Sequence, residues 1–498
     1  MTVYLSIIVF LPAAAGLLAV FLPRRIAGWA LVGGSVLALA YSIVMLARFK
    51  SGHGMQFVTD DNWISELGIR YHLGVDGLNL FLVMLTTVMW VPAAIAAALR
   101  EWRRPGLFFF FLGAGETAVL GAFMAQDLAL FVFFFDLMLV PFYFLIGMWG
   151  GEQRVYATTK LVIYTLVGSL LMLAAAVALG TMATPEGGHI SFSLATLAQH
   201  QLPAGSQYWI FLLFAAAFLV KAPAFPLHGW MPDAYTQAPL PVILVFSAVV
   251  SKVGVYGFLR IVLPIMPHAS VHFQELMLVI AVVSILYGSV LAFSQDDARL
   301  VLGYSSVAQL GFILLGIFSL DPKGGQGAVM QMVNHGLVVG PLFLVIGYLA
   351  LRAQGRETLD WMGGMAIRAP VLAGTFLIVA LATLAMPGSS NFIGELYILF
   401  GTFQSKIVYG LVASAGVALA AVYMIRFYQR AMHNPVGPHV ESRDLALGPE
   451  LGVIAPLVLV ILALGVYPNF LLHRIDAFAP TSGKSIAGAV FVPPERVR

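Results

Sequence analysis

Apolar runs of membrane-spanning length recur along almost the whole sequence, and they constrain the fold more than any other feature. The hydrocarbon core of a bilayer is about 30 Å thick, so a helix needs about 20 apolar residues to cross it. Hydrophobic residues make up 60% of the 498 residues and charged residues only 10%, which does not suit a water-exposed surface. The chain is therefore predicted to be an all-α polytopic membrane protein without extramembrane domains.

Fourteen such runs are separated by short polar or Gly/Pro-bearing breaks, which predicts about fourteen transmembrane helices. They lie near residues 3–22, 27–47, 76–98, 107–124, 127–148, 157–180, 208–226, 240–263, 273–293, 299–318, 326–351, 370–400, 407–428 and 449–470.

Basic residues predict the orientation of these helices. With the N-terminus outside, the turns on the cytoplasmic side hold Arg24, Arg25, Arg100, Arg103, Arg104, Arg154, Arg299, Arg352, Arg356, Arg368, Arg426, Arg430 and Arg443. The opposite short loops hold only Arg48, Lys50, Arg70, Lys323 and Lys406. Because positively charged loops stay on the cytoplasmic side, both termini are predicted to face outside.

Several classes of function lack support in the sequence. With no cysteine there is no disulfide, thiolate zinc site or cysteine-ligated iron–sulfur cluster, so redox chemistry is expected on partner proteins. Gly113, Gly115 and Ala118 match a dinucleotide fingerprint, but they lie inside an apolar run with no strand before them. No P-loop, HExxH or GxSxG motif occurs, and the net charge of +3 is scattered, which argues against nucleic-acid binding.

Two of the apolar runs look interrupted. The seventh carries Pro223 and Pro226 just after Lys221, and the twelfth contains MPGSSN at 386–391. Such breaks free backbone groups that a bilayer tolerates only where protein or internal water satisfies them, and broken helices mark transport sites. The alternative is a proline kink that serves only packing.

Ionisable residues within the apolar runs are the candidate functional residues, because each costs about 3 kcal/mol or more at bilayer depth. They are Glu116, Asp136, Lys160, Lys221, Lys252, His335 and Glu395. A buried lysine can load or release a proton as a neighbouring carboxylate moves or is protonated, whereas arginine stays charged.

Each candidate also has a structural interpretation. Asp136 and Lys221 could be a buried ion pair that only fixes helix register. Lys160 and Glu116 lie near helix ends, where a long side chain reaches the interface. His228 and His335 are candidate proton relays, although a histidine in an apolar helix often serves packing alone.

Polar residues along the same runs could hold water between the ionisable groups or hydrogen-bond helices together. They are Ser169, Ser247, Ser251, Tyr304, Ser305, Ser306, Gln309 and Asn334.

Long blocks of this sequence resemble the antiporter-like M subunits of proton-pumping NADH:quinone oxidoreductase, respiratory complex I. They are YHLGVDGLN at 71–79, DLMLVPFYFLIGMWG at 136–150, ATTKLVIYT at 157–165, VKAPAFPLHGWMPDAYTQAP at 220–239, SKVGVYGFLRI at 251–261, GYSSVAQLGF at 303–312 and MPGSSNFIGELYILFGTFQ at 386–404. The resemblance covers nearly the whole chain.

The resemblance implies a fourteen-helix fold with two inverted five-helix repeats, each containing one broken helix. The corresponding segments are 1–106, with the first three helices and an outside loop, 107–263 and 273–430, with the repeats, and 431–498, with the last helix and a tail. It also implies that a carboxylate on helix five pairs with a lysine on helix seven, and that a lysine on helix eight leads to an ionisable residue on helix twelve. In this chain these are Asp136, Lys221, Lys252 and Glu395.

The sequence departs from the family pattern at three places. Aspartate stands at 136 where the family usually has glutamate, and LPVILVFSA replaces a stretch of small residues after TQAP. Gln309 occupies the place of a histidine; it is expected, with Ser305 and Ser306, to organise water without carrying charge.

The implied function is proton translocation across a membrane, predicted to be a bacterial inner membrane, driven by quinone reduction elsewhere in a complex. No cofactor is expected on this chain, whereas NADH, FMN, iron–sulfur clusters and quinone are expected on partner subunits. One alternative is a subunit of a multisubunit sodium/proton antiporter or of a membrane-bound hydrogenase. A second alternative is a membrane scaffold that conducts no ion.

Overall fold

The computed structural model describes residues 4–184, 190–438, 440–446, 448 and 450–475, so the predicted C-terminal tail lies outside the described residues. The chain forms two compact units. The first consists of Met1–Pro223, Val249–Met277 and His473–Arg498, and the second of Ala224–Ala248 and Leu278–Leu472. The division into four segments implied by the resemblance stays a prediction.

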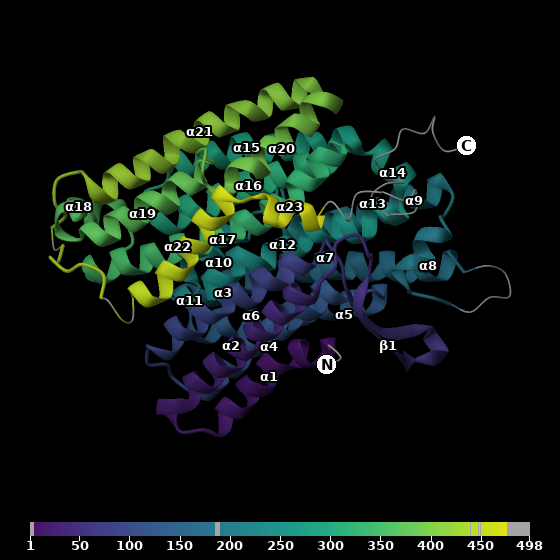
Figure 1. Ribbon diagram of the computed structural model, residues 1–498, viewed down its shortest axis with the longest axis horizontal. Helices are drawn as coiled ribbons and strands as arrows, with labels where there is room; N and C mark the ends of the chain where they lie inside the picture. Colours follow the sequence, from purple (N-terminus) through teal and green to yellow (C-terminus); the bar gives the residue numbers. More distant parts are fainter. Residues whose placement is uncertain (1–3, 185–189, 439, 447, 449, 476–498) are drawn as a thin grey trace. The chain divides into compact units, whose positions relative to one another are not determined.

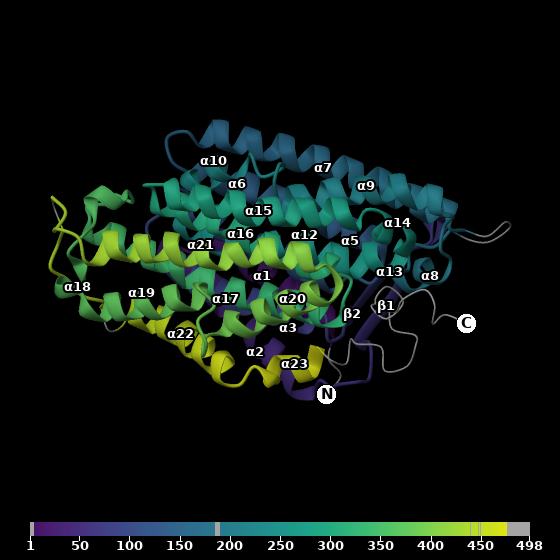
Figure 2. The same cartoon turned by 90° about the horizontal axis from the view of Figure 1, so that it is seen from above.

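The first unit is built mainly from the helices of the N-terminal part of the chain. They are α1 (Leu5–Phe21), α2 (Arg24–Arg48), α3 (Leu80–Ala98), α4 (Pro105–Met124), α5 (Leu128–Leu137), α6 (Leu139–Trp149), α7 (Arg154–Met182), α8 (Leu194–Gln199) and α9 (Ala204–Lys221). Helix α1 packs against both α2 and α4, which are among the purple and blue ribbons of Figure 1, and α7 packs along α9 (Figure 2).

The second unit is formed by the helices of the C-terminal half. They are α10 (Met231–Gln237), α11 (Leu240–Val245), α15 (Gln274–Ser294), α16 (Ala298–Phe318), α17 (Pro322–Arg352), α18 (Met365–Arg368), α19 (Pro370–Thr383), α20 (Ser390–Ser405), α21 (Ile407–Met432) and α22 (Leu451–Val466). Helix α17 packs against α16 and α20, and α20 also packs against α22. The first residues of α15 belong to the first unit, as do the last residues of the short helix α23 (Asn469–Ile475).

Aspartate caps explain where three of the helices begin. The Asp127 carboxylate accepts hydrogen bonds from the backbone N–H groups of Ala129 and Leu130 at the start of α5, at 2.9 and 3.1 Å. Asp297 and Asp321 cap α16 and α17 in the same way. A side-chain acceptor at this position satisfies amides that have no partner inside the helix, so these residues fix where each helix starts.

Every predicted apolar run contains a helix. However, fewer than fourteen of the described helices are long enough to span a bilayer. Among the described residues, eleven helices are long and apolar enough, or twelve if the bent pair α22 and α23 is one span. Helices α1 and α19 are apolar but have only 17 and 14 residues. The fold is thus a polytopic helical membrane protein, and the count of fourteen is not confirmed.

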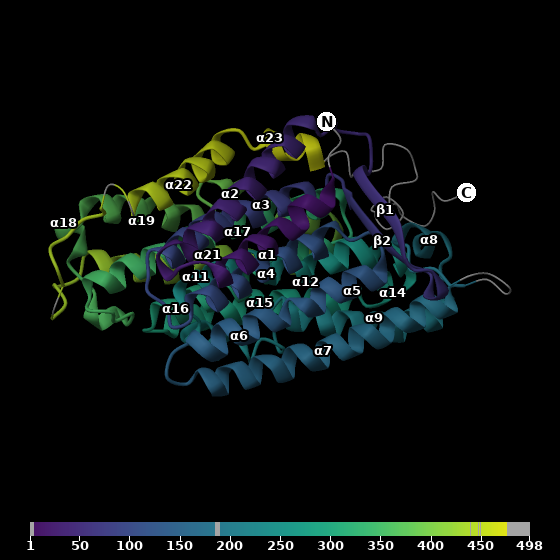
Figure 3. The ribbon, with the colours of Figure 1, turned by 90° about the horizontal axis from the view of Figure 1, so that it is seen from below.

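The loop expected between the second and third spans folds as a β-hairpin, which the apolar pattern did not predict. Strands β1 (Gln56–Ile64) and β2 (Ile69–Val75) pair antiparallel, with the short 3₁₀ turn Ser65–Leu67 between them. Gly68 ends that turn with a φ of +66°, which glycine adopts at no steric cost. Figure 3 shows the hairpin beside the start of α5, and β2 contacts that helix.

Both predicted helix breaks are present. Helix α9 ends at Lys221 and α10 begins at Met231, with turns between them, while α19 ends at Thr383 and α20 begins at Ser390. The eighth span carries a further irregularity, because π-helical stretches at Phe246–Val250 and Phe258–Val262 flank α12 (Ser251–Gly257). Helix α13 (Leu263–Ile265) and helix α14 (Pro267–His272) follow. Since π-helical turns frequently occur at functional sites, their position on both sides of the Lys252 segment supports Lys252 as a candidate functional residue.

Candidate functional site

Asp136 and Lys221 belong to the first unit, where they lie on α5 and α9. They are close enough to interact electrostatically, but no direct salt bridge joins these two described side chains. The Lys221 ammonium instead lies over the phenyl ring of Phe135, 4.7 Å from its centroid. Ser169 of α7 lies close to the Asp136 carboxylate. The pair that the resemblance implies is therefore present as neighbours and not as a contact pair.

Lys221 is the last residue of α9, and only 7% of it is exposed. The final carbonyl groups of a helix have no partner within it and carry partial negative charge, which favours a cation at this end. The break after Lys221 thus creates a polar end within an apolar stretch, and the lysine occupies it.

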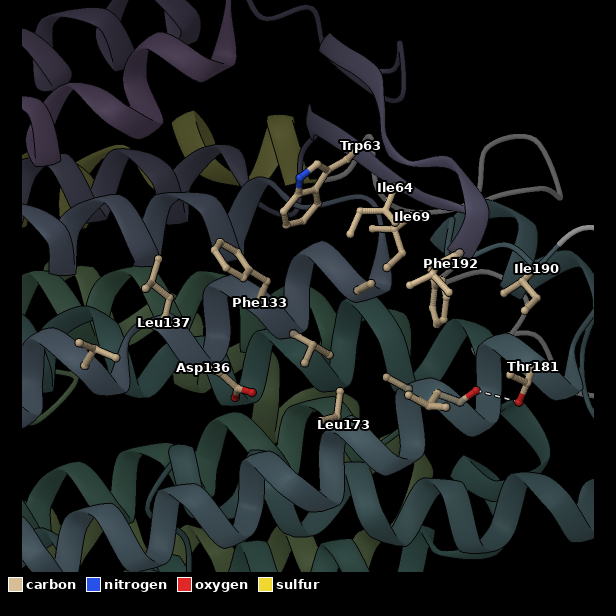
Figure 4. A pocket seen from close by; sticks show the side chains of 16 residues that line it. Trp63, Ile64, Ile69, Phe133, Asp136, Leu137, Leu173, Thr181, Ile190 and Phe192 are labelled. Atoms are coloured by element: carbon tan, nitrogen blue, oxygen red, sulfur yellow. Dashed lines mark hydrogen bonds between the residues drawn. The ribbon is translucent and has the colours of Figure 1, made fainter.

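An apolar cavity of about 660 Å³ lies beside Asp136 (Figure 4). It is lined by the hairpin, α5, α6, α7 and the segment before α8. Asp136 is the only charged residue in its lining, and the buried Oδ1 atom of Asp136 has no hydrogen-bond partner among the described residues. This oxygen of the carboxylate can therefore accept a hydrogen bond from a group other than the described side chains.

Lys252 is fully buried in α12, and its Nζ atom donates to the Ser251 hydroxyl at 3.3 Å. Two residues further on, Gly254 lets α12 approach α9 closely. A Cβ atom at Gly254 would lie 2.6 Å from the carbonyl oxygen of Phe218. This glycine therefore places the Lys252 segment against the last turn of α9, which ends at Lys221.

Two further relay candidates lie in the first unit. Glu116 on α4 is fully buried and accepts a hydrogen bond from the Ser35 hydroxyl at 2.7 Å, while its other oxygen has no partner among the described residues. Glu116 is thus a core residue. The structural interpretation, which placed its side chain at the membrane interface, does not fit this position. Lys160 on α7 is half-exposed, and its ammonium lies 5.8 Å from the centroid of the Tyr156 ring. This position fits the interfacial interpretation.

Glu395 in the second unit is held by two amide side chains. Gln309 of α16 donates to the Glu395 carboxylate at 2.8 Å, and Gln331 of α17 donates to Gln309 at 2.7 Å and to Glu395 at 3.4 Å. Gln309 therefore contacts Glu395 directly, whereas the sequence led us to expect an orienter of water. Gln331 was not singled out from the sequence, because one glutamine in an apolar run gives no sign of its partner.

The second unit also contains Ser305, Ser306, His228 and His335. Ser305 hydrogen-bonds to Tyr423 at 2.8 Å, and Ser306 lies 3.4 Å from the Ser247 hydroxyl. His228 and His335 are both buried, and the His228 ring lies 5.1 Å from that of Tyr287.

Buried polar groups also gather at the break before α20. Asn334 donates to the carbonyl oxygen of Ser390 at 2.6 Å. The side-chain polar atoms of Ser389, Ser390 and Asn391 are buried and have no partner among the described residues. Buried polar atoms in this state are commonly satisfied by water.

A third buried charge cluster was missed in the sequence. Arg260 donates to both oxygens of Asp76 at 2.8 and 2.6 Å, and to the Tyr256 hydroxyl at 2.9 Å. Tyr256 in turn donates to the carbonyl oxygen of Phe123 at 2.8 Å. The available signal was the position of Arg260 eight residues after Lys252 in an apolar run, which places both in one span.

No group of three or more histidine, aspartate or glutamate side chains within the described ranges is arranged to hold a metal ion. The site contains lysines and carboxylates, which can bind and release protons, together with neutral polar groups that can hydrogen-bond to them. Together with the broken helices, these groups define a polytopic membrane protein of the ion-translocating class.

Comparison with known proteins places the chain within this class. The family model described as NADH:quinone oxidoreductase/Mrp antiporter, transmembrane, matches residues 125–420. The chain is 38% identical over 487 residues to the NADH-quinone oxidoreductase subunit M of Rhodobacter capsulatus, covering 95% of this chain and 94% of the relative. The chain belongs to the NADH:quinone oxidoreductase/Mrp antiporter transmembrane family.

Two solved structures share the fold. A chain of respiratory complex I from Thermus thermophilus with bound NADH matches with a TM-score of 0.87 and 30% identity, covering 98% of this chain and 99% of that one. A chain of the Mrp complex from Dietzia sp. DQ12-45-1b matches with a TM-score of 0.84 and 21% identity, covering 99% and 100%. The second likeness concerns the fold alone.

Proposed function

We propose that this chain is the proton-translocating membrane-arm subunit of an NADH:quinone oxidoreductase. The supporting observation is the set of buried ionisable residues at the broken α9 and α20 helices, in a chain that is 38% identical to subunit M over nearly its whole length. The subunit belongs to an enzyme complex but carries out no redox chemistry of its own. Quinone reduction in partner subunits changes the electrostatic energy of the buried charges, and protons move in response.

Four residues carry the protons in this proposal, namely Asp136, Lys221, Lys252 and Glu395. Asp136 and Lys221 act as a separable pair, because they attract each other without a contact that would lock them together. A lysine can give up its proton when its counter-charge is withdrawn, which arginine cannot do. Lys252 and Glu395 continue the path.

The remaining candidates assist this transfer. Glu116, Lys160, His228 and His335 are relays between the main carriers and the two sides of the membrane. Gln309, Ser305 and Ser306 organise water, and Gln309 also holds the Glu395 carboxylate. Because glutamine does not titrate, a proton at this place resides on Glu395 or on water.

The cofactors of the reaction belong to partner subunits in this proposal. NADH, FMN, iron–sulfur clusters and quinone are bound there, in keeping with the lack of cysteine in this chain. The complex lies in a bacterial inner membrane, with both termini of this subunit outside, as the distribution of arginine indicates.

Replacing Lys221 tests the proposal. In membranes from a complemented strain, Lys221→Met should lower the number of protons moved per NADH oxidised, with the complex still assembled as judged by mass spectrometry of the purified complex. Lys323→Met removes an exposed lysine at the start of α17 and should leave this ratio unchanged. Normal assembly with an unchanged ratio in Lys221→Met would refute the role of this lysine.

The alternatives predict different results. If the chain belongs to a cation antiporter, it should purify with antiporter subunits, without flavin or iron–sulfur absorbance, and exchange sodium for protons without NADH. If it is a scaffold, replacing Asp136 and Lys221 together by leucine should leave both assembly and pumping intact. A loss of pumping alone rejects the scaffold.

A further inference from the structure

We infer that the ring of Phe135 is a second partner for Lys221, which holds the ammonium by a cation–π interaction when Asp136 does not. Phe135 directly precedes Asp136 on α5, and its ring lies under the lysine at 4.7 Å. The inference rests on the proposed function, since it names where the Lys221 ammonium lies after it leaves Asp136 and before it gives up its proton. Phe135 is thus a positioning residue that acts through Lys221.

The surroundings of Lys221 call for such a partner. The side chain is buried on the last turn of α9, and no direct salt bridge to Asp136 satisfies its charge. A buried charge without a partner is strongly unfavourable, so some group must stabilise the ammonium in this arrangement. The face of a phenyl ring within 6 Å provides this attraction, and it does so without a proton of its own to give or take.

The ring of Phe135 is held in place by other rings. Its centroid lies 5.7 Å from that of Phe131 and 5.9 Å from that of Phe218, and all three rings are buried. Phe218 belongs to the same last turn of α9 as Lys221. The ring is therefore pre-oriented, so little conformational entropy is lost when the ammonium settles on it.

The arrangement gives Lys221 two positions that differ in their counter-charge. Over the ring the lysine interacts with a neutral quadrupole, and at Asp136 it would meet a carboxylate. Asp136 is free to accept it, because its buried Oδ1 atom has no hydrogen-bond partner among the described residues. When Lys221 and Asp136 are apart, the lysine ammonium therefore lies on the ring of Phe135.

Stepwise fluorination of Phe135 tests this inference without changing the shape of the core. Mono-, di- and trifluorophenylalanine are introduced at position 135 in the full complex, and proton pumping per NADH oxidised is measured in membrane vesicles. Each fluorine weakens the negative face of the ring, so pumping should fall in graded steps, by about twofold to thirtyfold in total. Phe135→Trp, which keeps a strong ring face, should retain pumping, whereas Phe135→Leu should lose it.

Phe134 provides the matched control. It is a neighbouring buried ring that contacts Phe133, and its fluorination should change nothing. Pumping that does not depend on fluorination at position 135, while Lys221→Met abolishes it, would overturn the role of the ring and leave the proposed function intact. Pumping that is normal in Lys221→Met would refute the proposed function itself.

Discussion

Replacing Arg260 with leucine should destabilise the first unit by about 3 kcal/mol, near the lower end of the usual cost of breaking a buried ion pair. The substitution removes two hydrogen bonds to Asp76 and leaves a carboxylate whose side chain is only 12% exposed. The cost stays near the lower end because the Asp76 carboxylate still accepts hydrogen bonds from the backbone N–H groups of Leu78 and Asn79, at 3.0 and 3.3 Å. Tyr256 likewise keeps its hydrogen bond to the carbonyl oxygen of Phe123.

Intrinsic tryptophan fluorescence during heating of the detergent-solubilised complex measures this change. The apparent Tm of Arg260→Leu should fall by several degrees, and Asp76→Asn in the same chain should recover part of the loss, because the unpaired charge is then gone. Arg70→Gln is the control, because its ion pair with Asp60 is exposed on both sides and is screened by water. If Arg260→Leu unfolds at the same temperature as the unsubstituted protein, the cluster contributes nothing to stability and the reasoning fails.

Three further predictions concern other contacts. Gly254→Ala should push α12 away from the end of α9 and lower the yield of assembled complex, whereas Gly374→Ala, which meets no atom within 4 Å, should be neutral or slightly stabilising in the same assay. Gln331→Leu should lower proton pumping more than NADH oxidation, because Glu395 and its glutamine partner each lose a donor; equal losses would point to a folding defect. Burial holds the pKa of His72 below 6.5, so the folded hairpin favours the neutral imidazole. The contribution of His72 to hairpin stability is therefore present above pH 6.5 and is lost as the pH falls. Hydrogen exchange of the hairpin, corrected for intrinsic rates, should be faster at pH 5.5 than at 7.5, and His72→Gln should remove the difference.

The sequence predicted the helices and both breaks because each leaves a local signal. Apolar runs and prolines next to an ionisable residue act over a few residues, so they can be read without knowing the fold. The hairpin at 56–75 was missed because its residues mix charged and apolar side chains without strict alternation.

The partners of the buried charges could not be predicted because they lie far away along the chain. Arg260 and Asp76 are 184 residues apart, and Gln309 and Glu395 are 86 residues apart. Composition shows that a buried arginine or glutamate needs a partner, but not which residue supplies it. The resemblance implied the main charged residues by position, yet it gave no sign of the ring that Lys221 contacts.

Glu395 and Lys221 are held by different means, and this difference has a mechanistic consequence. Glu395 is fixed by hydrogen bonds from amide donors, so it has little freedom to move and is suited to change its protonation in place. Lys221 lies over a ring and near a carboxylate that it does not contact, and neither group restricts it to one direction, so it is suited to change partners. A moving charge alters the field at its neighbours, whereas a fixed group responds to a field by gaining or losing a proton. We therefore expect the lysine of the first unit to transmit the electrostatic signal and the glutamate of the second to answer it by binding or releasing a proton.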